Sequence, residues 1–452
     1  MFISLLVVLV AGLVLVGCQE TTPSPTQPSS TQPSSTQPAG NAPEKIIIGG
    51  TTAQTGIFSA MGVGATYSSR RAVEDINKLG GIYLSKYNKR VPVEYILVDD
   101  QSDENLGASL AEDLILRDKI QFFVSPNGFP NMVMPKQLVT ERYKIIHVSS
   151  ILPLEPMLAT DREYSWFQCF GIATPIEDQN DFRYGKRGYT IIDTWTKMIE
   201  DFGDQTNMTF GFFASDDSDG VAWYAGFPVA IESIYPDAKI IGVENKLGLF
   251  PVGTTDFSAT IQAWKNGGVE ILWGNSNGPD FGVLYRQAQS MGFKPKMVGA
   301  ARAALMPGDI NSWGGDLPNG VGIEIWGAPT MKGNEFIGNT TQEQLNQGWY
   351  DYSGGQYYNQ MVTQGYWTLQ TLFKAIEMAG DIDTEAVQKA FHNMDYISNY
   401  GRVKFDKDNI QRAPIVYGQW MKGTGEFPWE LKIVSSYHDF LPVDAAPIFP
   451  IP

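Results

Sequence analysis

Apolar residues along this chain follow two spacings in turn, and the alternation predicts strands that are each followed by a helix. Residues 46–48 are a run of isoleucines, which is typical of a buried strand. In residues 65–79 the apolar side chains recur every three, four and seven positions, and charged side chains fall on the opposite side. This spacing predicts an amphipathic helix that ends at Gly80 and Gly81. The two elements form the opening strand–helix unit of an α/β domain.

The same alternation occurs in two series. In the first series, strands are predicted at residues 46–48, 93–98, 120–124 and 144–148. In the second series, strands at residues 208–213, 239–243, 269–273 and 297–299 alternate with helices at residues 191–202, 221–234, 258–266 and 281–291. Strands that alternate with helices favour a doubly wound, mostly parallel sheet, with a ligand crevice at the carboxyl ends of its strands. We therefore expect two α/β lobes, each with its loops gathered at the edge where its strands end.

The amino-terminal segment predicts a lipoprotein. Residues 2–16 are almost all apolar but too few to span a membrane comfortably, and they run into Leu-Val-Gly-Cys ending at Cys18, which resembles a bacterial lipobox. Residues 1–17 are then a signal peptide, and a lipid on the Cys18 thiol anchors the protein outside the cytoplasm. The alternative is a plain signal anchor with an incidental cysteine. Residues 18–44, rich in Pro, Ser, Thr and Gln, are expected to form an extended tether.

Composition and charge narrow the class of partner. The chain has 452 residues, of which 43% are hydrophobic and 18% charged, as in ordinary globular proteins. Its formal net charge of -16, without a Lys/Arg cluster, argues against a nucleic-acid partner. With Cys18 lipidated, Cys169 is the only other thiol, so no intramolecular disulfide is expected. We expect neither a cofactor nor a metal.

Several short motifs, in one order along the chain, resemble a known family. They are Gln54-Thr55-Gly56 before Gly62, Ala-Val-Glu-Asp-Ile-Asn-Lys-Leu-Gly-Gly-Ile at residues 72–82, Val98-Asp99-Asp100, Thr-Asp-Phe-Ser at residues 255–258, and Arg286-Gln287-Ala288. Together they resemble the type I periplasmic solute-binding proteins of ABC importers, in particular the branched-chain amino-acid branch. The resemblance covers most of residues 45–432.

The resemblance implies two hinged lobes joined by three crossovers, near Phe170, Trp326 and Arg402. Lobe 1 would comprise residues 45–171 and 327–402, and lobe 2 residues 172–326 and 403–452. A small-molecule ligand would lie between the lobes, and closure around it would present the protein to ABC permease subunits. Such a receptor is a monomer and not an enzyme. A receptor that signals to another partner, rather than feeding a transporter, is an alternative that the sequence leaves open.

The resemblance also implies candidate ligand contacts. In the first lobe these are Met61, which would cover the ligand, Asn127, Gly128 and Phe129 after the third strand, and Ser149, Ser150 and Ile151 after the fourth. In the second lobe they are Asp219, Ser276, Asn277 and Arg302. The backbone amides and hydroxyls of the first set would take a carboxylate on the ligand.

Arg302 marks a departure from the family pattern. Where amino-acid binders commonly place a carboxylate for the ligand's ammonium, this chain has Ala300-Ala301-Arg302. A buried ammonium needs a charged acceptor. Either one of Asp216, Asp217 and Asp219 supplies it, or the ligand has no amino group and Arg302 binds its anion. We favour the second interpretation, with a surface role for Arg302 as the alternative to both.

A competing function is suggested by residues 274–278, Gly-Asn-Ser-Asn-Gly. They match the nucleophile elbow of serine hydrolases and lie between a predicted strand and a predicted helix. Ser276 would be the nucleophile, with His392 or His438 as the base. We do not favour this function, because nothing in the sequence pairs an acid and a histidine with Ser276. The acidic residues 216–220 resemble a calcium loop but lack its bidentate carboxylate, since Gly226 holds that position.

Overall fold

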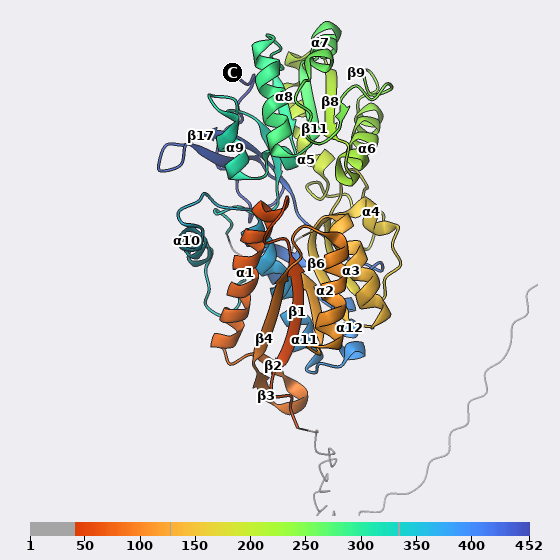
Figure 1. The fold of residues 1–452 in the computed structure, drawn as a ribbon, viewed down its shortest axis with the longest axis vertical. Coiled ribbons are helices and arrows are strands. Elements are labelled where there is room, and N and C mark those ends of the chain that lie inside the picture. The colour runs from red at the N-terminus through yellow and green to blue at the C-terminus, as the bar shows by residue number, and fades with distance from the viewer. Residues whose placement is uncertain (1–40, 127, 333–334) are drawn as a thin grey trace, which may run out of the picture. The chain divides into compact units, whose positions relative to one another are not determined.

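Two separate β-sheets form the core of the protein in a computed structural model, which describes residues 41–126, 128–332 and 335–452. Figure 1 shows β1, β4 and β6 in the lower part of the view and β8, β11 and β17 in the upper part. The predicted signal peptide, Cys18, Asn127 and the tether up to residue 40 lie outside the described residues. Within the described ranges, no helix combines the length and the apolar character needed to cross a bilayer.

The first sheet has the strand order β16-β7-β6-β5-β1-β4, and all its neighbouring strands are parallel. Its strands are β1 (Ile46–Thr52), β4 (Val93–Asp99), β5 (Phe122–Ser125), β6 (Ile146–Pro153), β7 (Ser165–Phe170) and β16 (Ile410–Arg412). The helices on this side are α1 (Ser59–Lys78), α2 (Glu104–Leu116), α3 (Pro130–Arg142), α4 (Leu154–Leu158), α10 (Gln342–Ser353), α11 (Met361–Ala379) and α12 (Thr384–His392). Because β1 is paired with β4 on one side and β5 on the other, the winding reverses at β1, which is where α/β sheets open a crevice.

The second sheet has the order β10-β8-β11-β12-β13-β17-β18, with β9 paired to β8. Its strands are β8 (Thr209–Ser215), β9 (Lys239–Ile241), β10 (Leu249–Phe250), β11 (Ile271–Asn275), β12 (Met297–Ala300), β13 (Gly322–Ile325), β17 (Val416–Lys422) and β18 (Trp429–Ser435). The helices are α5 (Ile191–Phe202), α6 (Ser218–Ile234), α7 (Ser258–Gly267), α8 (Gly278–Ser290) and α9 (Pro307–Trp313). From β8 to β13 the pairs are parallel, whereas β17 and β18 are antiparallel. The predicted two-lobed, mostly parallel α/β fold is confirmed.

Short antiparallel hairpins complete the described fold. They are β2 (Ile82–Leu84) with β3 (Lys89–Val91), and β14 (Tyr396–Ser398) with β15 (Gly401–Val403). Short 3-10 turns cover Ser85–Tyr87, Gly203–Gln205 and Arg302–Ala304. The last of these follows β12 and holds Arg302.

The chain passes between the sheets three times, after β7, after β13 and between β16 and β17. The third passage follows Arg412, ten residues beyond the expected position near Arg402, because residues 410–412 pair with β7 in the first sheet. The sequence does not predict this pairing, because a buried strand is usually indicated by a run of apolar or β-branched residues, and Ile410-Gln411-Arg412 contains only one. The lobe boundaries expected from the sequence otherwise stay a prediction.

An aromatic cluster fills the second lobe beneath its loops. The ring centroid of Trp195 on α5 lies 5.4 Å from that of Trp223 on α6 and 5.3 Å from that of Trp273 on β11. These rings are buried, and aromatic contacts of this kind add rigidity to a core beyond the area they bury. The cluster fixes the position of α6 and β11, whose ends carry pocket residues.

Candidate functional site

A cavity with an empty volume of about 400 Å³ is lined by residues of both lobes. The described lining residues are Met61, Phe129, Ile151, Pro153, Phe170, Ile191, Asp219, Trp223, Asn275, Ala301, Arg302, Leu305, Glu324 and Trp326. A wider mouth continues from it, past Ile57 and Phe58 on one side and Asp217, Asn277 and Asp309 on the other.

The cavity lies where the strand order reverses in each lobe. Met61 is in the first turn of α1, after β1, and Phe129 precedes α3, after β5. Asp219 is in the first turn of α6, after β8, and Asn275 ends β11. β1 and β5 are neighbours in one sheet, and β8 and β11 are neighbours in the other. The fold therefore brings together loop residues that are far apart in the sequence.

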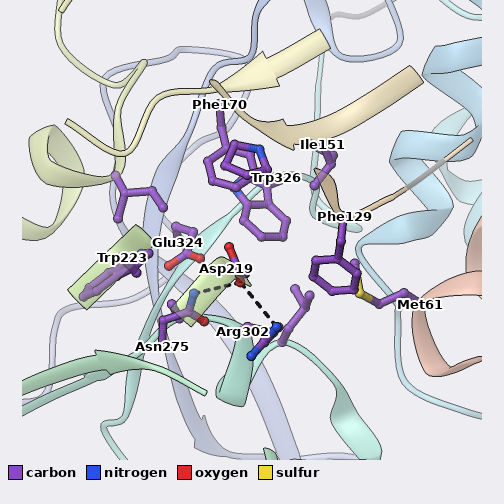
Figure 2. Close-up of a pocket in the computed structure, with 14 residues that line it drawn as sticks. Met61, Phe129, Ile151, Phe170, Asp219, Trp223, Asn275, Arg302, Glu324 and Trp326 are labelled. Atoms are coloured by element: carbon purple, nitrogen blue, oxygen red, sulfur yellow. Dashed lines mark hydrogen bonds and ion pairs between the residues drawn. The ribbon is translucent and has the colours of Figure 1, made fainter. Parts of the chain in front are cut away.

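The first-lobe wall of the cavity is apolar among the described residues. It consists of Met61, Phe129, Ile151, Pro153 and Phe170, all of which are buried. Trp326 extends this wall, because its ring stacks on that of Phe170 with centroids 5.0 Å apart (Figure 2). A ligand can bury a hydrocarbon or aromatic part here.

The second-lobe wall carries the polar groups. Asn275 Nδ2 donates a hydrogen bond to Asp219 Oδ2 over 2.8 Å, and Arg302 Nη1 lies 3.4 Å from the same oxygen. Figure 2 shows these three side chains and Glu324 around one side of the cavity, with Phe129, Ile151 and Met61 on the other. The cavity is therefore amphipathic, with its charges on one lobe.

Arg302 is held by two carboxylates. Its Nη2 donates to Asp217 Oδ2 over 2.6 Å, and Nη1 pairs with Asp219. The guanidinium carbon also lies 5.6 Å from the ring centroid of Phe129, which comes from the other lobe. Asp217 is itself the N-cap of α6, accepting a hydrogen bond from the Gly220 amide. Arg302 thus lines the cavity with its positive charge balanced by Asp217 and Asp219, and the same two contacts fix the position of its side chain.

Glu324 is a pocket residue that the sequence analysis missed. It lies on β13, its residue is 2% exposed, and burial, with help from the negative charge of Asp219, raises the pKa of its carboxyl to about 8. The signal was present in Val321-Gly322-Ile323-Glu324-Ile325-Trp326, where one acid interrupts an apolar run. Such an acid is almost never fully buried without a partner or a function.

The structure places the predicted site residues in three groups. Five of them, Met61, Phe129, Ile151, Asp219 and Arg302, line the cavity, and Asn277 lines its mouth. Gly128 borders a small separate space beside Phe129, Asp100 and Lys136. Ser149, Ser150 and Ser276 are buried and line neither the cavity nor its mouth. As ligand contacts, all of these residues stay predictions, as does Asn127.

Two of these residues have structural partners. Ser150 Oγ donates to the carbonyl oxygens of Pro126 and Gln364, each over 3.3 Å, so its hydroxyl holds β6 to the preceding loop and to α11. Asn277 is the N-cap of α8, because its Oδ1 accepts from the Asp280 amide over 2.8 Å. Neither role could be read from residue type alone.

The mouth is acidic on the second-lobe side. Asp217, Asp219, Asp280 and Asp309 line it together with Arg302. Burial raises the pKa of Asp309 to about 6. Clefts lined by one sign of charge raise the local concentration of the opposite sign. The mouth therefore has more carboxylates than cations on this side, with Arg302 paired to two of them.

Ser276 is not arranged as a nucleophile. Its hydroxyl donates to the carbonyl oxygen of Asn277 over 3.1 Å, and no hydrogen bond joins it to a histidine among the residues that the structure describes. His438 is bonded to the Gly188 carbonyl, and His392 packs on Trp166. The described ranges also contain no group of three His, Cys, Asp or Glu side chains suited to a metal ion. The geometry supplies no base for hydrolysis at this serine.

Comparisons with known proteins agree with this architecture. Residues 45–424 match the family model described as periplasmic binding protein. The fold is similar to a leucine binding protein, LivK, from Thermotoga maritima, with a TM-score of 0.67 and 17% identity over 87% of this chain and 99% of that one. It is also similar to LivJ from Streptococcus pneumoniae in complex with isoleucine, with a TM-score of 0.64 and 15% identity over 86% and 99% of the chains.

A third solved structure differs in its ligand. It is a solute binding protein of an ABC transporter from Rhodopseudomonas palustris in complex with 3,4-dihydroxybenzoic acid, with a TM-score of 0.64 and 15% identity over 91% of this chain and 99% of that one. At these identities the structures establish the fold, and the family match covers most of the chain. The chain belongs to the periplasmic binding protein family.

Proposed function

We propose that this protein is an extracytoplasmic receptor that captures a small carboxylate-bearing ligand between its lobes and delivers it to an ABC importer. The candidate ligands are aliphatic carboxylates, aromatic carboxylates and branched-chain or other hydrophobic amino acids. The observation that carries the proposal is the cavity shared by both lobes, with an apolar wall on one lobe and charged groups on the other. Only a ligand that contacts both lobes can stabilise their closed arrangement.

Groups for a carboxylate are present on the cavity wall. The Arg302 guanidinium has five N–H donors. Its bonds to Asp217, Asp219 and the Ser276 carbonyl use part of this set, and the remaining donors are available to a ligand. The indole nitrogens of Trp223 and Trp326 are buried donors that have no hydrogen-bond partner within the described part of the chain. A ligand carboxylate that pairs with Arg302 would use the guanidinium donors that remain.

Similar proteins support this range of ligands. LivJ was solved with isoleucine and the Rhodopseudomonas protein with a dihydroxybenzoic acid, so the same fold holds both ligand types. Delivery to permease subunits follows from the ABC transporters to which such proteins belong. Lipidation of Cys18 would keep the receptor near its transporter, with residues 18–44 as the tether. We take the receptor to act as a monomer.

The ligand class is tested by a thermal-shift screen. Leucine, isoleucine, valine and phenylalanine are compared with 4-methylpentanoate, 3-phenylpropanoate and benzoate, each at 1,000 times the dissociation constant expected. A ligand that binds only the folded protein should then stabilise it by about 4 kcal/mol and raise the Tm by several degrees.

If none of these carboxylates raises the Tm or gives heat in calorimetry, the proposed ligand class is wrong. As a matched control, Arg286 lies on the outer side of α8, where it bonds to the Ser312 and Trp313 carbonyls away from the cavity. Arg302→Gln should weaken binding of any carboxylate that does bind by about tenfold or more, and Arg286→Gln should not.

A further inference from the structure

After β18 the chain leaves the second sheet and then returns to it. Asp444 closes this excursion, because its amide donates to the Ile433 carbonyl on β18 over 2.8 Å. Further on, the Ile451 amide donates to the Lys296 carbonyl, just before β12, over 3.0 Å. Figure 1 shows the carboxyl terminus in the upper part of the view, with β8 and β11. Residues 436–444 are therefore fixed to the second lobe at both ends, and we call them the carboxyl-terminal strap.

The strap reaches the first lobe at Phe440. The ring of Phe440 packs on that of Tyr400, with centroids 5.9 Å apart, and Tyr400 packs on Trp367 of α11. A side-chain carbon on Gly401 would lie 2.8 Å from Cζ of Phe440, so the ring lies directly on the backbone of β15. Leu441, the next residue, is fully buried. The strap is thus a noncovalent link between the lobes, in addition to the three passages of the chain.

The strap is also bonded to the passages themselves. The Gly188 carbonyl in the first passage accepts a hydrogen bond from His438 Nε2 over 2.8 Å. The same oxygen accepts from the Ile415 amide in the third passage over 2.7 Å. In the second passage, the Lys332 amide donates to the Phe440 carbonyl over 3.0 Å. A carbonyl oxygen can only accept, so Nε2 of His438 carries the proton. All three passages are therefore tied together at the strap.

These contacts favour the arrangement of the lobes in which they form. In this arrangement the lobes also meet across the cavity, since the guanidinium carbon of Arg302 lies 5.6 Å from the ring centroid of Phe129. Hinge motion requires the connecting segments to change their backbone angles. Contacts that tie those segments together then have to change as well. Interactions made in one arrangement and lost in another shift the populations of the two.

We propose that the carboxyl-terminal strap is a hinge restraint that stabilises the arrangement of the lobes seen in the structure. Phe440 holds the strap to the first lobe, and His438 holds it to the first passage. The inference goes beyond the proposed function, because it concerns the equilibrium between lobe arrangements in the ligand-free protein.

Spin labels on the two lobes measure this equilibrium. Leu138→Cys on α3 and Val229→Cys on α6 place one label on each lobe, and both positions are exposed. Cys18→Ser removes a thiol that would otherwise be labelled, and Cys169 is buried. The full chain with these three substitutions is the parent protein. Double electron–electron resonance gives the distribution of distances between its labels without ligand.

Two strap variants are compared with the parent. Phe440→Ala and His438→Phe should each reduce the population at the parent's main distance, relative to other distances, by about two- to tenfold. The first loses an aromatic pair, and the second loses a hydrogen bond. Val443→Ala is the matched control, because this residue of the strap is exposed, and it should keep the parent's distribution. His438→Phe keeps an aromatic ring and decides alone if Phe440→Ala does not fold.

The outcomes separate this inference from the proposed function. An unchanged distance distribution in the folded strap variants would overturn the inference and leave the carboxylate receptor intact. A shift in Val443→Ala as large as that in the other two variants would also overturn it, because the specific contacts would then not matter. If the strap variants shift the distances but no carboxylate binds in the thermal-shift screen, the strap stands and the proposed function fails.

Discussion

At the scale of single residues, the site is decided by which polar groups already have partners. Arg302 looks like a free anion-binding group in the sequence, yet two aspartates hold it. Ser149 and Ser150 look like ligand hydroxyls, yet they do not line the cavity. Residue type and strand position could predict which loops form the site. They could not predict pairing between side chains 85 residues apart, such as Arg302 and Asp217.

The pKa of Glu324 makes a pH prediction for amine-bearing ligands. Burial raises this pKa to about 8, so in the free protein the carboxyl holds a proton at lower pH, whereas a ligand whose ammonium pairs with Glu324 requires the ionised carboxylate. Binding then releases a proton, and affinity for leucine should fall by up to about tenfold for each pH unit below 8. Calorimetry between pH 8 and pH 6 measures this slope directly.

The neighbouring groups identify the origin of that slope. Asp219 on α6 and Arg302 after β12 are the charged groups that share the wall with Glu324, and Tyr417 on β17 pairs with it across the sheet. Burial raises the pKa of Tyr417 well above this pH range, so its hydroxyl stays protonated. Glu324→Gln should flatten the slope. A slope that persists in this variant would assign the proton to another group, such as Asp309 at the mouth.

At the scale of elements, the position of Met61 depends on how closely the first turn of α1 packs against the loop that follows β1. A side-chain carbon on Gly62 would lie 1.8 Å from the carbonyl oxygen of Ala53, so only glycine allows this contact. Most strands and helices could be predicted because their apolar periodicity is clear. β13 was missed because it is a four-residue strand with an acid in it. Residues 403–434 are expected to form strands and turns of the second lobe, but β16 within them pairs with β7 of the first sheet, which the local sequence Ile-Gln-Arg does not reveal.

Gly62→Ala should therefore displace the first turn of α1 and Met61 with it. Backbone atoms cannot yield as a flexible side chain can, so we expect a loss of about 1–3 kcal/mol in the free energy of unfolding and weaker ligand binding. Gly226→Ala is the matched control, since it also lies inside a helix, α6, and a side-chain carbon there meets no atom within 4 Å. It should be neutral or stabilising by up to about 1 kcal/mol. Urea unfolding compares the two, and equal stabilities would contradict the close approach.

At the scale of the whole molecule, the passages between the sheets are anchored on the first lobe. The Glu155 carboxylate on α4 accepts hydrogen bonds from the amides of Ile172, Ala173 and Thr174, over 2.9 to 3.1 Å. The Arg412 guanidinium donates to the Thr174 carbonyl over 3.0 Å. The sequence predicted that three crossovers exist, but these anchors depend on contacts between distant segments that no local pattern reveals.

Replacing Glu155 tests this anchor. Glu155→Ala leaves three amides without their acceptor, and the free energy of unfolding should fall by about 2 kcal/mol. Glu155→Gln keeps one acceptor oxygen and should lose less. Urea unfolding gives both values, and hydrogen exchange at residues 172–174 should speed up in the alanine variant. Unchanged exchange there would show that the crossover is held by other contacts.

The division of the cavity into a charged wall on one lobe and an apolar wall on the other has a kinetic consequence. In the proposed receptor, a ligand would dock its charged end on the second lobe before the lobes close, and the first lobe would then contact only its hydrocarbon part. The charged end of the ligand would then determine the association step, and the shape of its apolar part would determine how stable the closed state is. Truncating this wall, as in Ile151→Ala, should thus shorten the ligand's residence time and leave its association rate the same.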